Sequence, residues 1–220
     1  MMKKAVVFGA SGFVGSYLLR ELLDSPDYEE VIAVVRRELP LSHPKLRMWI
    51  GDYNSSSETR EKFVCDEVFI ALGSTTKRTP DKREYYQVDH DYPVLAARLA
   101  REGGAHSVFL VSSVGANAAS KTFYIRTKGE TERDILALNF EHTRIFRPSM
   151  IMGHRSENRP LERVVLKVWP LIDLFLVGNV DRYRGTSAED IARAMKNSAK
   201  DAAGRSKIYY WREMRELLQC

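Results

Sequence analysis

The chain opens with a short apolar run that leads directly into a loop of three glycines. Residues 5–8 predict a buried strand, and glycines follow at positions 9, 12 and 15 before leucines recur with helical spacing. A strand, a glycine-rich turn and a helix in this order can hold a pyrophosphate, because the turn admits it closely and the helix N-terminus offers free N–H groups. A turn that merely needs small residues is the alternative. The predicted cofactor contacts are Gly9, Ser11, Gly12, Phe13, Val14 and Gly15.

Two arginines stand where the second predicted strand, residues 30–35, ends. Dinucleotide folds place the adenosine ribose at this point, about 20 residues past the glycines. An acid would bind the ribose 2′-hydroxyl, whereas the guanidinium groups of Arg36 and Arg37 match a 2′-phosphate. The pattern therefore favours NADP(H) over NAD(H), with a pair of solvated loop arginines as the alternative.

The third and fourth predicted strands also end in candidate cofactor contacts. The third leads into Asp52 and Tyr53, and Asp52 could accept from the adenine amino group or cap a short helix. The fourth leads into Leu72 and Gly73, where a small-residue turn lets a ribose or nicotinamide lie against the backbone. Both turns are predicted to contact the cofactor.

Predicted strands and helices alternate along the first 153 residues. This alternation predicts an α/β fold with a Rossmann-type doubly wound parallel sheet. Residues 85–101 form one predicted helix, and Pro93 within it implies a kink or a late start. Residues 155–220 are too few for a second domain, so we expect a single domain over 1–220 with a small C-terminal helical lid on the substrate side. The other predicted strands span residues 46–50, 67–71, 107–111 and 142–146.

Charge and cysteine content narrow the expected partners and compartment. A net charge of +5 would suit nucleic acid, but the lysines and arginines are scattered, which favours a polyanionic cofactor, so no nucleic acid is expected. Two cysteines without ligand spacing, and no secretory leader, predict a cytoplasmic protein without a metal. Charges and a proline interrupt the apolar stretch over residues 164–180, so we expect no integral membrane association. The same stretch could form a homodimer face.

One predicted helix, residues 122–138, places a tyrosine and a lysine one turn apart. Tyr124 and Lys128 share a face, and an ammonium so close makes a tyrosine a better acid or base near neutral pH. Lys128 could also donate to the cofactor ribose, and hydroxyl groups on Ser112 and Ser113 could orient a substrate carbonyl. Such a pair alone is common on exposed helices, so its weight comes from its place after the glycine loop, the arginines and the serines.

These motifs together resemble the short-chain dehydrogenases/reductases of the atypical or extended type. The glycine loop is similar to the G-x-x-G-x-x-G cofactor loop of that family, and Tyr124 with Lys128 is similar to its catalytic pair. The resemblance implies that Ser113 is the catalytic serine and that Ser112 lies at the cofactor. It places Asp89 where the family often has an asparagine. It also implies a segment that lines the nicotinamide: Arg147, Pro148 and Ser149.

Residues 124–132 and 145–153 are especially similar to the Tat-interacting-protein-like oxidoreductases, which bind NADPH. The resemblance implies an NADP(H)-dependent oxidoreductase that acts on a small carbonyl or alcohol, with Ser113, Tyr124 and Lys128 as catalytic residues. A non-catalytic NADPH-binding regulator is one alternative. A nucleotide-sugar epimerase or dehydratase is another, although the C-terminal region is short for such an enzyme.

Overall fold

The computed structural model describes residues 2–51, 63–75, 78–153, 176, 178–201 and 204–219. Its centre is a seven-stranded parallel sheet in the order β3-β2-β1-β4-β5-β6-β9. A separate short pair joins β7 to β8. The strands are β1 (Lys3–Phe8), β2 (Tyr28–Val35), β3 (Leu46–Ile50), β4 (Glu67–Ile70), β5 (Ser107–Val111), β6 (His142–Phe146), β7 (Ile151–Met152), β8 (Thr186–Ser187) and β9 (Ser206–Tyr209).

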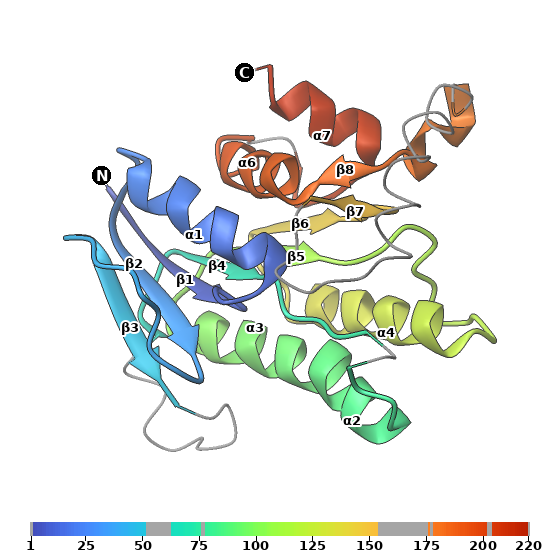
Figure 1. Ribbon diagram of the computed structural model, residues 1–220, viewed down its shortest axis with the longest axis horizontal. Coiled ribbons are helices and arrows are strands. Elements are labelled where there is room, and N and C mark those ends of the chain that lie inside the picture. The colour runs from blue at the N-terminus through green and yellow to red at the C-terminus, as the bar shows by residue number, and fades with distance from the viewer. Residues whose placement is uncertain are drawn as a thin grey trace.

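Helices cover both faces of the sheet, as Figure 1 shows. One face carries α1 (Phe13–Asp24), α6 (Ala188–Ser198) and α7 (Trp211–Leu217), and the other carries α2 (Lys82–Tyr86), α3 (Tyr92–Glu102) and α4 (Phe123–Ala137). A π-helical turn, η2 (Gln87–Asp91), and a 3₁₀ helix, η3 (Gly178–Tyr183), complete the described helical elements. The chain winds outward from β1 in one direction and from β4 in the other, so the strand order reverses between them. The predicted doubly wound Rossmann-type sheet is confirmed.

The inner strands β1, β2, β4 and β5 supply side chains to two cores, because successive residues of a strand point to opposite faces. In β1, Ala5 and Val7 pack in the core beneath α1 and α6, whereas Val6 and Phe8 pack in the core beneath α3 and α4. All four side chains are fully buried. Burial on both faces explains why this strand reads as a continuous apolar run.

The helix predicted over residues 85–101 is present but interrupted, and α2, η2 and α3 share it. Proline has no N–H, so Pro93 cannot donate to the carbonyl of Asp89 as a regular α-helix would require. The Tyr92 N–H donates instead to the carbonyl of Gln87, which makes η2 a π-helical turn. The late start expected at Pro93 therefore takes the form of a widened turn just before it.

The described part of residues 155–220 belongs to the central fold. β9 pairs with β6 as the seventh strand, and α6 packs along α1. β9 and α6 therefore depart from the lid predicted over residues 155–220, because they extend the central sheet and one of its helical layers. Residues 155–175 of that prediction lie outside the described residues, as do Asp52, Tyr53 and Cys220. Within the described ranges, no helix is long and apolar enough to cross a membrane.

Candidate active site

Backbone contacts exclude side chains at two glycines of the loop between β1 and α1. Gly9 has a φ of +87°, and a Cβ atom there would lie 2.6 Å from the carbonyl oxygen of Ala71. A Cβ atom on Gly15 would lie 2.0 Å from the carbonyl oxygen of Gly9. The Gly12 N–H donates to that same oxygen at 2.8 Å and closes the loop. The start of α1 is therefore held directly against the ends of β1 and β4.

Gly12 and the N-terminus of α1 form a surface that fits a phosphate group. No side chain caps this helix, and no acid lies in its first turn. A Cβ atom on Gly12 would meet backbone only at the carbonyl oxygens of Gly9, at 3.0 Å, and Ala71, at 3.8 Å. Ser11 is exposed beside it, whereas Val14 is buried in the core and presents only its backbone. The N-terminus of a helix and the positive end of its dipole suit the pyrophosphate of a dinucleotide.

The turns after β1, β5 and β6 meet at one edge of the sheet. The ring of Phe13 lies against Gly153, where a Cβ atom would be 2.8 Å from the ring Cζ atom. The carbonyl of Pro148 accepts a hydrogen bond from the Val114 N–H at 2.9 Å. Ser149 is half-buried in the same segment. The residue after β7 thus lies against the start of α1, and the segment predicted to line the nicotinamide is joined to the turn after β5.

Arg36 and Arg37 are exposed at the carboxyl end of β2. β2 pairs with β1 up to Phe8 opposite Val34, so the two arginines follow the strand that neighbours the glycine loop. This is the position that the sequence predicted for them. Their contact with a 2′-phosphate stays a prediction.

Helix α4 carries the predicted catalytic pair. Tyr124 lies in its first turn and is 37% exposed, whereas Lys128, one turn later, is 7% exposed. The Lys128 ammonium lies 2.8 Å from Oδ1 of Asp89, and a Cβ atom on Gly73 would lie 3.5 Å from the same ammonium. The turn after β4 therefore passes next to the lysine. Leu72, in that turn, packs against the core on the α3 side.

The Lys128 ammonium stays charged although it is buried. Burial by itself lowers its pKa, but the charges of Asp89 and then Tyr124 more than offset this and raise the pKa above its ordinary value. Tyr85 lies edge-on to Tyr124, with ring centroids 6.5 Å apart. Burial, followed by the Asp89 charge, raises the pKa of Tyr85 beyond the usual range for a tyrosine. Of the two phenols, Tyr124 is the more exposed one.

The hydroxyl of Ser112 belongs to a buried network around Glu132 of α4. Ser112 Oγ donates to Oε1 of Glu132, and Arg147 Nε donates to the same oxygen at 2.9 Å. The second Glu132 oxygen accepts from Arg147 Nη2, and Arg147 Nη1 donates to the Tyr210 hydroxyl at 2.8 Å. The hydrogen bonds with Glu132 raise the pKa of Arg147. These side chains join α4, the end of β6 and the start of α7. The contacts of Ser112 and Arg147 with a cofactor stay a prediction.

Ser113 lies outside this network. Within the described ranges, its Oγ makes only a long 3.4 Å contact with the carbonyl of Val114, and the residue is 6% exposed. The catalytic role assigned to Ser113 stays a prediction. Sequence reasoning missed Glu132 altogether, because its partners Ser112 and Arg147 lie 20 and 15 residues away along the chain. The one local signal was an acid one turn beyond Lys128 on the same helix.

A doubly wound parallel sheet with a glycine loop at its switch point and a tyrosine–lysine pair near the same edge defines a Rossmann-fold dinucleotide-binding protein of the short-chain dehydrogenase/reductase type. The sequence profile of the NAD dependent epimerase/dehydratase family matches residues 5–207. The chain belongs to this family.

Similar proteins come from fungi. A Candida glabrata protein called "Protein FMP52, mitochondrial" is 37% identical over 154 residues, which cover 70% of this chain and 66% of that protein. "Protein fmp52, mitochondrial" of Aspergillus fumigatus is 34% identical over 208 residues, which cover 91% and 88%. The structure of MoeE5 in complex with UDP-glucuronic acid and NAD matches with a TM-score of 0.70 at 22% identity, covering 93% of this chain and 75% of that one. The last likeness confirms the fold.

The names of the fungal relatives overturn the expectation of a cytoplasmic protein. That expectation rested on few cysteines and on the lack of a secretory leader, and it was wrong because neither observation identifies a compartment within the cell. These relatives are named FMP52, not as Tat-interacting proteins.

Proposed function

We propose that this chain is an NADP(H)-dependent oxidoreductase of the short-chain dehydrogenase/reductase type that acts on a small carbonyl or alcohol. The observation that carries this proposal is an exposed Tyr124 one turn from a buried, charged Lys128, next to the Gly73 turn at the sheet edge. When bound, a nicotinamide dinucleotide supplies or accepts a hydride. The proposal includes the finer likeness to the Tat-interacting-protein-like oxidoreductases.

Each element at this edge has a part in holding the cofactor. The amides of the glycine loop and the start of α1 would bind the pyrophosphate, as their geometry favours an anion. Arg36 and Arg37 would bind a ribose 2′-phosphate. The N–H groups of Lys128 that do not face Asp89 would donate to the nicotinamide ribose.

Tyr124 would move the proton. Its Oη would donate to the substrate oxygen during reduction and accept from it during oxidation. The Lys128 ammonium stabilises the negative charge that Tyr124 carries after giving up its proton. Ser113, whose hydroxyl is not engaged by the Glu132 network, would donate to the same substrate oxygen and fix its position.

To test catalysis, the protein is incubated with NADPH and each of a panel of aldehydes and ketones. Oxidation of NADPH is measured as the loss of absorbance of the reduced nicotinamide. Tyr124→Phe should lower the rate at least about 100-fold, the contribution typical of a general acid. Tyr183→Phe is the matched control, because this exposed tyrosine lies on η3. Equal rates for Tyr124→Phe and the unchanged protein would refute the role of Tyr124. Tight NADPH binding with no turnover on any substrate would favour a non-catalytic NADPH-binding regulator.

Cofactor choice needs its own measurement, because the matched MoeE5 structure contains NAD. Dissociation constants for NADPH and NADH should favour NADPH in the unchanged protein. The double variant Arg36→Ser/Arg37→Ser should lose that preference while its NADH affinity changes little. Arg98→Ser, on the outer side of α3, should change neither constant. A preference for NADH in the unchanged protein would refute the assignment to NADP(H).

A nucleotide-sugar epimerase or dehydratase is the second candidate, favoured by the family that matches residues 5–207. Such an enzyme returns its cofactor to the starting oxidation state, so it converts substrate without net consumption of NADPH. Incubation with UDP-sugars and chromatographic analysis of the products distinguishes the two reactions.

A further inference from the structure

A backbone carbonyl of the π-helical turn η2 contacts a side chain of α4. Pro93 cannot donate to the carbonyl of Asp89. Oγ1 of Thr131 lies 2.8 Å from that oxygen and also 2.8 Å from the carbonyl oxygen of Thr127, so its one proton is shared between the two carbonyls. Thr131 lies 42 residues further along the chain and is 1% exposed. This hydrogen bond fixes Asp89 relative to the helix that carries Tyr124 and Lys128.

The side chain of Asp89, itself almost fully buried, gives one oxygen to each of two partners. Oδ1 lies 2.8 Å from the Lys128 ammonium, and Oδ2 accepts from the Ser74 N–H at 2.7 Å. Ser74 directly follows Gly73, where a Cβ atom would lie 3.4 Å from Oδ1. One carboxylate thus connects the lysine to the turn after β4.

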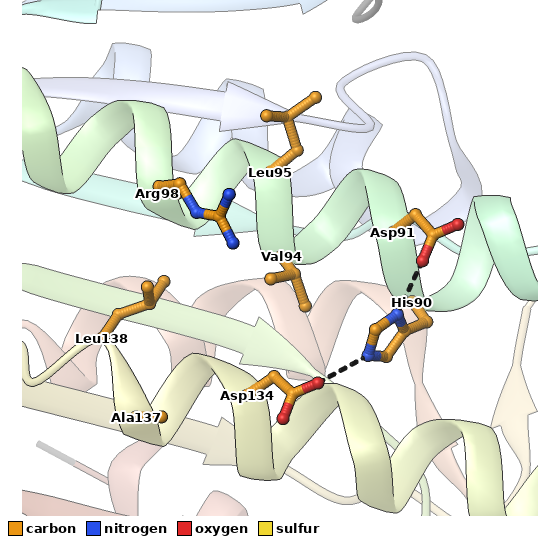
Figure 2. A pocket seen from close by; sticks show the side chains of 8 residues that line it. All are labelled: His90, Asp91, Val94, Leu95, Arg98, Asp134, Ala137 and Leu138. Carbon is orange, nitrogen blue, oxygen red and sulfur yellow. Dashed lines mark hydrogen bonds and ion pairs between the residues drawn. The ribbon is translucent and has the colours of Figure 1, made fainter.

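His90 links η2 to α4 through one of its two ring nitrogens. Its Nδ1 lies 2.8 Å from a carboxylate oxygen of Asp91, and its Nε2 lies 2.9 Å from one of Asp134 (Figure 2). Tyr86 stacks on the His90 ring, with centroids 4.5 Å apart. His90, Asp91 and Asp134 lie at one end of a groove of about 480 Å³ between α3 and α4. η2 is therefore attached to α4 from both sides, and Asp89 is held in place.

The electrostatic surroundings of Lys128 make Asp89 the decisive neighbour. Tyr124 and Glu132 face the lysine from its own helix, Tyr85 faces Asp89 from α2, and Asp89 faces the lysine from η2. Glu132 is engaged with β6 through two hydrogen bonds from one guanidinium. Asp89 therefore supplies the compensating charge in direct contact with the buried ammonium.

We propose that Asp89 is a positioning residue that keeps the buried Lys128 charged and fixed beside Tyr124 and the Gly73 turn. The part that concerns catalysis rests on the proposed function. Short-chain dehydrogenases/reductases often have an asparagine at the position of Asp89. An asparagine there would still accept a hydrogen bond from the Ser74 N–H but would carry no charge. In this chain the charge of the catalytic lysine depends on a carboxylate that is set in place by Pro93 and Thr131.

The direct test is the titration of the Lys128 Nζ resonance by ¹⁵N NMR, with Lys128→Met to assign the signal. In Asp89→Asn the ammonium keeps its burial and loses its partner, so it should give up its proton at a lower pH than in the unchanged protein. Asp91→Asn is the matched control, because it removes a carboxylate charge from the same turn while its amide oxygen can still accept from His90. The control should leave the Lys128 titration unchanged.

NADPH affinity gives a second readout. In Asp89→Asn the dissociation constant should rise about tenfold per pH unit once Lys128 is neutral, whereas the unchanged protein should show no such rise at that pH. An unaltered Lys128 titration in Asp89→Asn would overturn the proposal. If the unchanged protein binds neither NADPH nor NADH, the proposed function fails, and the titration still decides the role of Asp89.

A variant that does not fold is also informative. If Asp89→Asn is unfolded, the double variant Asp89→Asn/Lys128→Met should recover a cooperative unfolding transition, because both buried charges are then absent. A double variant less stable than Lys128→Met alone would contradict the pairing of Asp89 with Lys128.

Discussion

Replacing Gly15 by alanine tests the glycine loop at its tightest contact. The new Cβ atom would lie 2.0 Å from the carbonyl oxygen of Gly9 and 2.7 Å from its carbonyl carbon. Real Cβ atoms do not approach heavy atoms within 3.0 Å, so the loop or the start of α1 must move by at least about 1 Å. Both contacting groups are backbone, so no side-chain rotation can relieve the clash.

The expected loss of stability follows from two opposing effects. Overpacking of this kind costs about 3 kcal/mol at the upper end of its usual range, and alanine recovers about 1 kcal/mol over glycine in a helix. The free energy of unfolding of Gly15→Ala should therefore fall by about 2 kcal/mol. For a chain of this size, such a loss lowers Tm by about 4–8 °C.

Gly12→Ala provides the contrast, because its Cβ atom would meet only the Gly9 carbonyl oxygen closely, at 3.0 Å, and its φ of −82° suits alanine. We expect it to cost less than about 1 kcal/mol and to weaken NADPH binding at least tenfold, since the methyl group fills the approach to the pyrophosphate. Urea unfolding and NADPH fluorescence titration measure the two effects separately. A Gly15→Ala protein within about 0.5 kcal/mol of the unchanged one would refute the reasoning.

Two further predictions concern charged side chains. Glu132→Ala leaves the largely buried guanidinium of Arg147 without its carboxylate, so urea unfolding should show a loss of about 3 kcal/mol; a loss below about 1 kcal/mol would contradict the structural role of the pair. Hydrogen bonds from Arg133 and then from His90 lower the pKa of Asp134 against the opposing effect of burial. The ionised Asp134 contributes less than about 1 kcal/mol to the free energy of unfolding. This contribution is present above about pH 4, the pKa of an aspartate in the unfolded chain, and is lost as the pH falls through the lower pKa in the folded protein. The stability difference of Asp134→Asn at pH 7 should therefore vanish on acidification, and a difference that persists would exclude this ion pair as its source.

Much of the fold was predictable because its signals are local. The predicted strands over residues 46–50, 107–111 and 142–146 coincide with β3, β5 and β6. β5 is buried on both faces, and its nearly continuous apolar run is visible in the chain itself. β3 is partly exposed and β6 begins with polar residues, so their bounds followed from shorter apolar stretches. The spacing of Tyr124 and Lys128 likewise required only the helical repeat.

The environment of that pair was not predictable from local patterns. Asp89 was recognised only as a departure from the resembling family, and nothing in the sequence indicated that it contacts Lys128. Ser112 is turned toward Glu132, 20 residues away, and this contact depends on how α4 packs against β5. Helix packing of this kind is decided by contacts between segments that are distant in the sequence.

The sequence by itself thus determined the strand–loop–helix at the N-terminus, the parallel sheet and the one-turn spacing of Tyr124 and Lys128. Only the tertiary structure decided which charges surround the lysine. The reason is physical: a backbone repeat is set by neighbouring residues, whereas the free energy of a buried charge is set by whatever lies within a few ångströms in space. Here that neighbour is Asp89, 39 residues earlier in the chain.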